Sequence, residues 1–382
     1  MKYASIDNTD TPPQQQRRFT VTWTKSLIFV GLCVLLPGLI ISSISSSGSS
    51  FAQPSLTSSS SQSSICTNGH YSKTTLKPAV TYPFISLFPD TKGANKFEGS
   101  DVIYHDGYFY AIADSLWSIL SISSSMTLFG EDNEMIGDPF RDPDEESGYE
   151  ALFLIDDIFY VVRESIQDLD EDGEYHAIVE ELSMNEDRKD YTIQKTCKSS
   201  FGFEGDSKGF EGAVGLKSKS GELYLLGLCE GNHCREGKIG KERGNGRVVV
   251  LRKTTSETGC SWDAVTTLSL PSDASFQDYS AISVNDEGRV AVTSQEDSAL
   301  WTGYLTLDEE GFFDPDIAEF KTDKIMNFPR DDECRMVYCN IEGIHWVGEN
   351  QVVAVSDKMK NRGKQDFRCF DLDQSIHIFA LP

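Results

Sequence analysis

Five stretches of the chain carry an acidic or hydroxyl residue at matching places, and such side chains can bind a hard cation. "FEGSDVIYHDGYFYAIAD" (97–114) returns in similar form at 149–164, 210–230, 279–295 and 341–357. The second position of these stretches holds Glu98, Glu150, Glu211, Ser280 and Glu342. Carboxylates that converge without partners repel one another and take up protons, whereas calcium accepts several oxygen ligands in loose geometry. If the five stretches share one axis, the pattern predicts a calcium site there.

Each stretch has the pattern of a β-hairpin, in which two apolar runs are joined by Asp, Gly or Asn. The pattern recurs about every 60 residues, and further strand-like runs follow each hairpin. About four strands in each repeat are typical of a β-propeller. We therefore predict an all-β fold over 79–382, namely a five-bladed propeller. A six-bladed ring with one degenerate blade and a β-sandwich are the alternatives.

The N-terminal end of the predicted domain can supply the strand that its last repeat lacks. "QSIHIFAL" (374–381) supplies only a third strand to the last repeat, and "AVTYPFISLF" (79–88) precedes the first repeat. We expect this N-terminal stretch to become the fourth strand of the last blade, because an unpaired edge strand invites aggregation.

In a propeller the first strand of each blade lines the central channel. The second strand is antiparallel, so its end lies beside the start of the first. Those ends are Asp114, Glu164, Glu230, Gln295 and Asp357. The sequence thus predicts that one mouth of the channel has two layers of mostly acidic side chains, one from the starts of the first strands and one from the ends of the second strands. The alternative is that the repeated glutamates accept hydrogen bonds from neighbouring backbone amides and only hold the ring together.

The hairpin at 97–114 resembles the first-blade motif of calcium-activated nucleotidases of the apyrase type, Glu-Leu-Ser-Asp-Leu followed by a hairpin on Asn-Gly. "SQEDS" (294–298) and "IEGIHWV" (341–347) are similar to later motifs of that family. Its members are five-bladed propellers, often on type II signal anchors. The resemblance implies a central calcium ion held by Ser100, Asp101, Glu150, Glu211, Ser280 and Glu342. "LLGLCEGNHC" (225–234) and "DQSIHIF" (373–379) look like uncharacterised secreted propellers related to the phytase esterase-like group.

One departure from the nucleotidases concerns phosphate binding. Their Asp-Asp-Arg-Thr-Gly stretch after the first hairpin is replaced by "ADSLW" (113–117), which has no arginine. Phosphate hydrolysis needs cations on the phosphates besides the metal. The candidate cations are Arg163, Lys238, Lys241, Arg243 and Arg247, and the candidate general bases are Asp114 and Glu230. We expect a non-catalytic, calcium-binding module for a nucleotide, protein or glycan ligand. The alternative is a calcium-dependent nucleotidase or phosphohydrolase.

The net charge disfavours a nucleic-acid-binding protein, and two stretches resemble known binding loops only in part. The chain has 34 basic and 60 acidic residues and a net charge of −26, so we expect no nucleic-acid partner. "DLDEDGE" (168–174) begins like an EF-hand loop, but Val179 occupies the place of the final glutamate. "GNHCREGK" (231–238) has five residues between its glycines where a P-loop has four. We expect an acidic hairpin loop and a disulfide-closed excursion, respectively.

The N-terminal region predicts entry into the secretory pathway. Residues 1–25 are polar and basic, "SLIFVGLCVLLPGLIISSI" (26–44) is uncharged, and 45–78 is rich in serine. The positive-inside rule predicts a cytoplasmic tail, a transmembrane signal anchor and a lumenal or extracellular stalk, as in a single-pass type II membrane protein. A cleaved signal peptide, which would give a secreted protein, and a bipartite plastid signal at "SSFAQP" (49–54) are the alternatives.

Eight cysteines follow the apolar segment. An even number in a chain that enters the secretory pathway predicts disulfides. Two pairs are close enough in sequence to be expected, Cys229–Cys234 and Cys339–Cys369. A zinc site is disfavoured because the sequence contains no Cys-x-x-Cys pair.

Overall fold

The computed structural model describes residues 74–142, 145–167, 173–205, 208–257, 259–359, 369 and 372–382, all within the compact unit Ser58–Pro382. The predicted tail and anchor, nearly all of the stalk and most of the acidic loop 168–174 lie outside these residues. In the part of the chain that is described, no helix is long and apolar enough to cross a bilayer.

The described chain is almost entirely β-structure. The first strands of the repeats are β2 (Gly99–His105), β6 (Tyr149–Ile155), β10 (Phe210–Lys217), β14 (Ala281–Val284) and β18 (Ile341–Trp346). The second strands are β3 (Tyr108–Ala113), β7 (Ile158–Gln167), β11 (Leu223–Cys229), β15 (Arg289–Ser294) and β19 (Gln351–Ser356).

Two more strands complete each repeat. The third strands are β4 (Leu116–Ser123), β8 (Tyr175–Met184), β12 (Arg247–Thr255), β16 (Ala299–Leu305) and β20 (Ser375–Ala380). The outermost strands are β5 (Glu134–Ile136), β9 (Tyr191–Phe203), β13 (Cys260–Ser269), β17 (Phe320–Asn327) and β1 (Lys77–Pro83). Short helical turns are η2 (Phe84–Ser86), η3 (Asn232–Cys234) and α1 (Gly237–Gly240).

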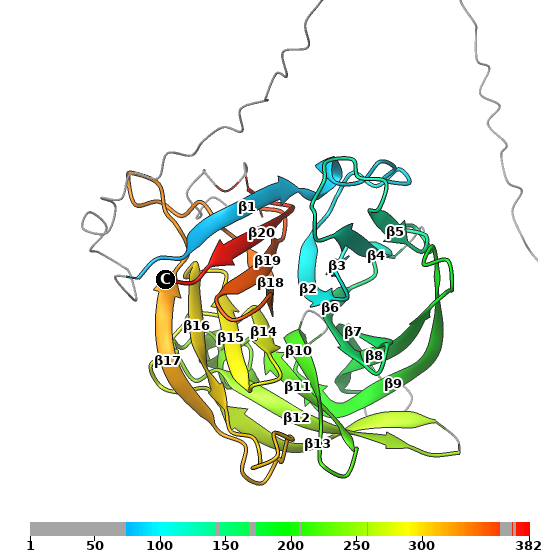
Figure 1. The fold of residues 1–382 in the computed structure, drawn as a ribbon. Helices are drawn as coiled ribbons and strands as arrows, with labels where there is room; N and C mark the ends of the chain where they lie inside the picture. Colours follow the sequence, from blue (N-terminus) through cyan, green and yellow to red (C-terminus); the bar gives the residue numbers. More distant parts are fainter. Residues whose placement is uncertain are drawn as a thin grey trace, which may run out of the picture. The chain divides into compact units, whose positions relative to one another are not determined.

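The sheets are antiparallel meanders arranged around a common centre. Three have four strands, in the orders β2-β3-β4-β5, β14-β15-β16-β17 and β18-β19-β20-β1. The fourth has eight, because β9 and β13 join two meanders through a short parallel pairing at Ser261 and Trp262. Strands β2, β6, β10, β14 and β18 contact one another in a closed cycle, and Figure 1 shows them gathered around the middle. The predicted propeller fold is confirmed.

Strand β1 closes the ring. It pairs antiparallel with β20, with Val80 opposite Ile378 and Tyr82 opposite Ile376, and the two strands lie side by side in Figure 1. The predicted closing strand is therefore present, although it ends at Pro83 instead of continuing to residue 88. The chain turns there because Phe84 and the apolar residues after η2 enter the core under the first sheet.

Apolar side chains fill the spaces between neighbouring sheets. One cluster joins β11 and β12 to β14–β17 around the fully buried Trp301, and another joins β6–β8 to β10–β13 around Trp262. Trp117, Trp301 and Trp346 are buried, as expected of inter-blade core residues. Close packing of these large side chains fixes the inner strands on which the site is built.

Three disulfides join described residues. Cys229–Cys234 and Cys339–Cys369 are the two expected pairs, and the third is Cys197–Cys260. The third links the middle of β9 to the start of β13, next to their parallel pairing. Such bonds persist in oxidising compartments, so the protein belongs in the secretory pathway or outside the cell.

Candidate functional site

Four of the five inner strands have a β-bulge at a predicted metal-ligand position. The register of each shifts around one extra residue, which is Ser100, Glu150, Glu211 or Glu342. In β14 the ladder begins at Ala281, and the preceding Ser280 takes the equivalent place. Glu98, which the sequence pattern aligned with the glutamates, lies two residues too early. Gly99 pairs with Ala113 as Tyr149 pairs with Arg163, so Ser100 is the equivalent of Glu150. Bulges redirect side chains and often lie near functional sites.

The next residue along each inner strand lies at a constriction. These residues are Asp101, Ala151, Gly212, Ala281 and Gly343. A Cβ on Gly343 would lie 2.6 Å from the Cα of Asp101, and one on Gly212 would lie 2.9 Å from the Cα of Ala281. Neighbouring inner strands thus approach so closely that only glycine fits at these two positions.

Asp101 uses its carboxylate to connect inner strands. The N–H groups of Val102 and Leu152 each donate to one of its oxygens at 2.8 Å, and the N–H of Ile344 also donates. The side chain is 2% exposed, and burial raises its pKa well above the usual range although these bonds oppose the shift. The carboxylate therefore joins β2 to both β6 and β18. This is the ring-holding role considered above for the glutamates, and here Asp101 performs it.

Ser280 joins strands in a similar way. Its hydroxyl donates to the carbonyl oxygen of Ile341 on β18 at 2.8 Å and lies 3.0 Å from the hydroxyl of Thr293. Two of the expected calcium ligands thus already make hydrogen bonds within the ring. Ser100 is buried, and its hydroxyl donates a long hydrogen bond of 3.4 Å to the carbonyl oxygen of Glu98.

The three bulge glutamates differ in exposure. Glu150 and Glu211 are half-buried, Glu342 is buried, and none of the three is without a partner. Among described residues, only Glu181, Cys197 and Cys260 bring three ligand atoms of Asp, Glu, His or Cys within 4.8 Å of one another. Because Cys197 and Cys260 form a disulfide, that group offers no thiolate to a metal.

At the acidic mouth, Asp114 lies among other carboxylates. Its Oδ1 is buried and has no hydrogen-bond partner. Burial, with the nearby charges of Glu98 and Asp357, raises the pKa of Asp114 to about 8. Lys96 pairs with Glu98 and lowers the pKa only in part. This group brings the predicted base Asp114 and the predicted second-layer residue Asp357 together, because β2, the partner strand of β3, packs against β19 of the adjacent sheet.

A cavity of about 550 Å³ adjoins another part of the mouth. It contains two predicted residues, Glu230 and Lys241, beside Gln295. Further cations line it, namely Lys208, Arg235 and Arg330. Lys208 forms an ion pair with Glu230, and the Nε–H of Arg330 is buried without a partner. Lys208 and Arg330 lie in connecting segments outside the repeats, so no sequence signal marked them.

The other predicted cations do not line this cavity. Arg163 stacks 4.8 Å from the centre of the Trp117 ring, in the neighbouring sheet, and pairs with Glu180 at 3.5 Å on its own sheet. Arg243 donates to both carboxylate oxygens of Asp297, at 2.8 and 3.0 Å. Arg247 donates to the carbonyl oxygen of Gly246, and Lys238 lies in α1.

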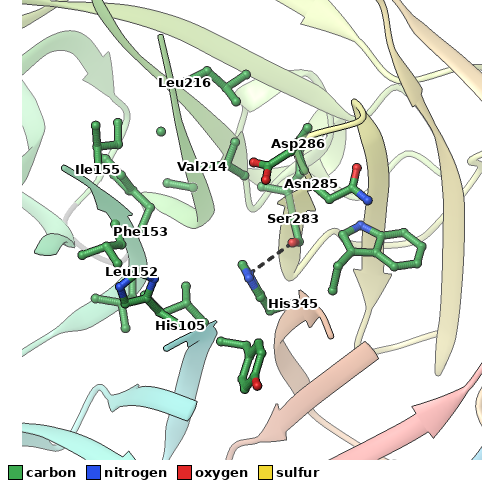
Figure 2. Close-up of a pocket in the computed structure, with 18 of the residues that line it drawn as sticks. His105, Leu152, Phe153, Ile155, Val214, Leu216, Ser283, Asn285, Asp286 and His345 are labelled. Atoms are coloured by element: carbon green, nitrogen blue, oxygen red, sulfur yellow. Dashed lines mark hydrogen bonds between the residues drawn. The ribbon is translucent and has the colours of Figure 1, made fainter. Parts of the chain in front are cut away.

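A second cavity of about 680 Å³ lies at the other ends of the inner strands, where the hairpins turn. Its walls come from all five inner strands, and Figure 2 shows His345 beside Ser283 among the residues that line it. The imidazole Nδ1 of His345 lies 3.4 Å from the hydroxyl of Ser283. Burial lowers the pKa of His345 to about 4, so this side chain is neutral at physiological pH.

No protein-family model matches the chain, and no curated protein matches it in sequence. Solved structures show a distant likeness. A glutaminyl cyclase from Myxococcus xanthus is 10% identical, with 81% of this chain and 98% of that chain covered and a TM-score of 0.41. A PQQ-bound aldose sugar dehydrogenase from Streptomyces coelicolor is 11% identical, with 80% and 100% covered and a TM-score of 0.39. A GH43_1 enzyme from Xanthomonas citri complexed with xylotriose is 12% identical, with 79% and 90% covered and a TM-score of 0.41. None of these three is a nucleotidase, and likenesses this distant carry no argument about activity.

Proposed function

We propose that this protein is a propeller of the secretory pathway that binds Ca²⁺ at its acidic mouth and there holds an anionic ligand without transforming it. The observation that carries the proposal is the buried, unpartnered Oδ1 of Asp114 beside Glu98 and Asp357. A buried carboxylate oxygen without a donor is destabilising, and a cation would satisfy it. Carboxylate oxygens are the ligands that calcium prefers.

The proposed ligand set differs from the one implied by the nucleotidase resemblance. Asp114 and Asp357 would hold the ion together with the bulge glutamates Glu150, Glu211 and Glu342. Asp101 and Ser280 would keep the inner strands together, since their polar atoms already hydrogen-bond across the ring. Bound calcium would neutralise the mouth and attract the anionic oxygens of a ligand. Lys208 and Lys241 would contact the same ligand from the neighbouring cavity.

Thermal unfolding of the full-length chain tests calcium binding. Calcium at a hundred times its Kd should stabilise the folded state by about 2.7 kcal/mol. For a chain of this size, that is a rise in Tm of roughly 5 °C over the chelated protein. Asp114→Asn should abolish most of the rise, whereas Asp132→Asn, at an exposed loop aspartate, should retain it. A Tm that does not respond to calcium, or an equal response of both variants, would overturn the proposal.

A second candidate function is calcium-dependent phosphohydrolysis, favoured by the cations that line the cavity beside Glu230. With a pKa of about 8, Asp114 is mostly protonated at neutral pH, so it could serve as a base only when a cation lowers that pKa. Phosphate release from nucleoside di- and triphosphates, with calcium and with chelator, separates the two functions. Release that disappears in Glu230→Gln and Lys241→Met would establish the hydrolase. Calcium binding without release would leave the binding module.

The proposal includes two finer points of architecture. We count five blades, since five inner strands form the cycle and the eight-stranded sheet divides at its short parallel pairing. We also assign residues 26–44 to a type II signal anchor. Protease protection in microsomes should then leave the propeller intact and trim only the N-terminal tail, whereas a signal-peptide product would be released by carbonate.

A further inference from the structure

The cavity at the hairpin-turn end has the size and walls of a small-molecule site. Its volume of about 680 Å³ lies within the range of roughly 300–1,000 Å³ common for such sites. Its wall combines apolar residues, such as Leu216, Ile344 and Phe312, with polar ones, such as His105 and Asn285. The acidic residues of the proposed calcium site do not line it, so this cavity needs a separate explanation.

Charges around this cavity disfavour an anionic occupant. Lys217 lines the cavity, but its ammonium group pairs with Asp156 in the turn after β6. Asp286 adds a further acid at the rim. His345 is neutral because burial lowers its pKa to about 4. Asp101, at the inner end, already accepts backbone hydrogen bonds.

One buried donor in the wall has no acceptor. Trp346 lines the cavity and is 5% exposed, and its indole Nε1–H is buried without a hydrogen-bond partner. The guanidinium of Arg289 lies 4.3 Å from the centre of the ring and fixes its position. An indole N–H donates only, so its partner must be a hydrogen-bond acceptor. His345 and Ser283 add weakly engaged polar groups, since they are 3.4 Å apart.

The rim has a hydrophobic edge on the loop between β16 and β17. Phe312 lines the cavity yet is 41% exposed. Its loop is held across to β10, because the N–H of Phe313 donates to the carbonyl oxygen of Lys217 at 3.1 Å. A second tie is the ion pair of Lys219 with Glu310 at 2.7 Å. An aromatic side chain fixed at the edge of a cavity can pack on a ligand without first becoming ordered.

We propose that this cavity binds a small uncharged molecule with an apolar body and a carbonyl or other acceptor group that receives the indole N–H of Trp346. The apolar walls and Phe312 hold the body of the molecule. The acceptor pairs a buried donor of the wall for which the described residues provide no partner. This site lies apart from the acidic mouth and does not depend on calcium.

A neutral fluorescent ketone tests the proposal. Prodan has a naphthalene body and one carbonyl acceptor, and its emission reports both polarity and hydrogen bonding. We would titrate it into the full-length chain with chelator present, by direct fluorescence and by energy transfer from tryptophan. Trp346→Phe keeps the ring but removes the donor. Its matched control is Trp262→Phe, because the indole N–H of Trp262 is also buried without a partner but lies in another core cluster.

We expect saturable binding that is about fivefold weaker in Trp346→Phe and unchanged in Trp262→Phe, since one hydrogen bond contributes that much. Phe312→Ala should weaken binding by about threefold through lost apolar contact, and Phe140→Ala, an exposed phenylalanine elsewhere, should not. The phenylalanine pair is at the surface and keeps the test valid if a tryptophan variant fails to fold. Prodan that partitions into the apolar N-terminal segment gives the same signal in every variant. Binding that is absent, or equal in each variant and its control, would overturn the proposal.

Discussion

Replacement of Asp101 by alanine would distinguish a residue that holds the ring from a calcium ligand. The carboxylate accepts the N–H groups of Val102, Leu152 and Ile344, on three different inner strands. In Asp101→Ala these donors remain buried and lose their acceptor. The sequence resemblance assigns the same side chain to the metal, so the two roles make opposite predictions for the calcium-free protein.

The magnitude follows from the bonds. Each buried donor left without a partner costs about 1–3 kcal/mol, so three donors give roughly 3–9 kcal/mol. Burial raises the pKa of Asp101, so removal of the carboxylate also relieves an unfavourable buried charge and offsets part of this loss. We expect a net loss of about 3 kcal/mol, or a fall in Tm of roughly 6 °C. Asp101→Asn retains one acceptor oxygen and should lose less.

The assay is thermal unfolding of wild type, Asp101→Ala and Asp101→Asn, with chelator and with calcium. Asp132→Ala, at an exposed loop position, controls for the removal of one negative charge. If Asp101 holds the ring, the loss is the same with and without calcium. A variant that matches wild type in chelator and falls behind only in calcium would refute this reasoning and make Asp101 a metal ligand.

Three further predictions concern a buried acid, a buried ion pair and a disulfide. Burial and neighbouring acids raise the pKa of Asp114 to about 8, so the folded protein keeps a proton that the unfolded chain loses near pH 4. The chelated protein should therefore lose stability as pH rises from about 4 to 8, by up to about 1.4 kcal/mol per pH unit, and Asp114→Asn should flatten this slope in pH-dependent unfolding. Arg163→Met leaves Glu180 buried without its cation, so the unfolding free energy should fall by about 3 kcal/mol, while calcium affinity measured by calorimetry stays unchanged. Replacement of Cys197 and Cys260 by serine opens a loop with a sequence separation of 63, and urea unfolding should show a loss of about 4 kcal/mol; a loss below 1 kcal/mol would contradict the loop-entropy argument.

The sequence predicted the parts of the fold that recur or that lie close together along the chain. Repeated hairpins placed the inner strands, the unmatched stretch 79–88 gave the closing strand, and short spacings gave two of the disulfides. The individual residues of the site were harder to predict. The aromatic–glutamate match aligned Glu98 with the glutamates, whereas the strand pairing makes Ser100 the equivalent of Glu150. Asp101 bonds to an amide 51 residues away, and Lys208 reaches the mouth from a connecting segment, so neither role has a local signal.

The pairing of β1 with β20 has a consequence for how the chain is made. The hydroxyl of Thr81 lies 3.1 Å from the ring nitrogen of His377, a partner 296 residues later in the sequence. Translation at about 5–20 residues per second needs roughly 15–60 s to cover that distance. Throughout this time β1 is in the secretory compartment without its partner strand, and the ring has an open edge on which another chain could pair. The ring therefore cannot close until β20 has been made, and a ribosome that stops before residue 375 leaves a molecule with an open edge.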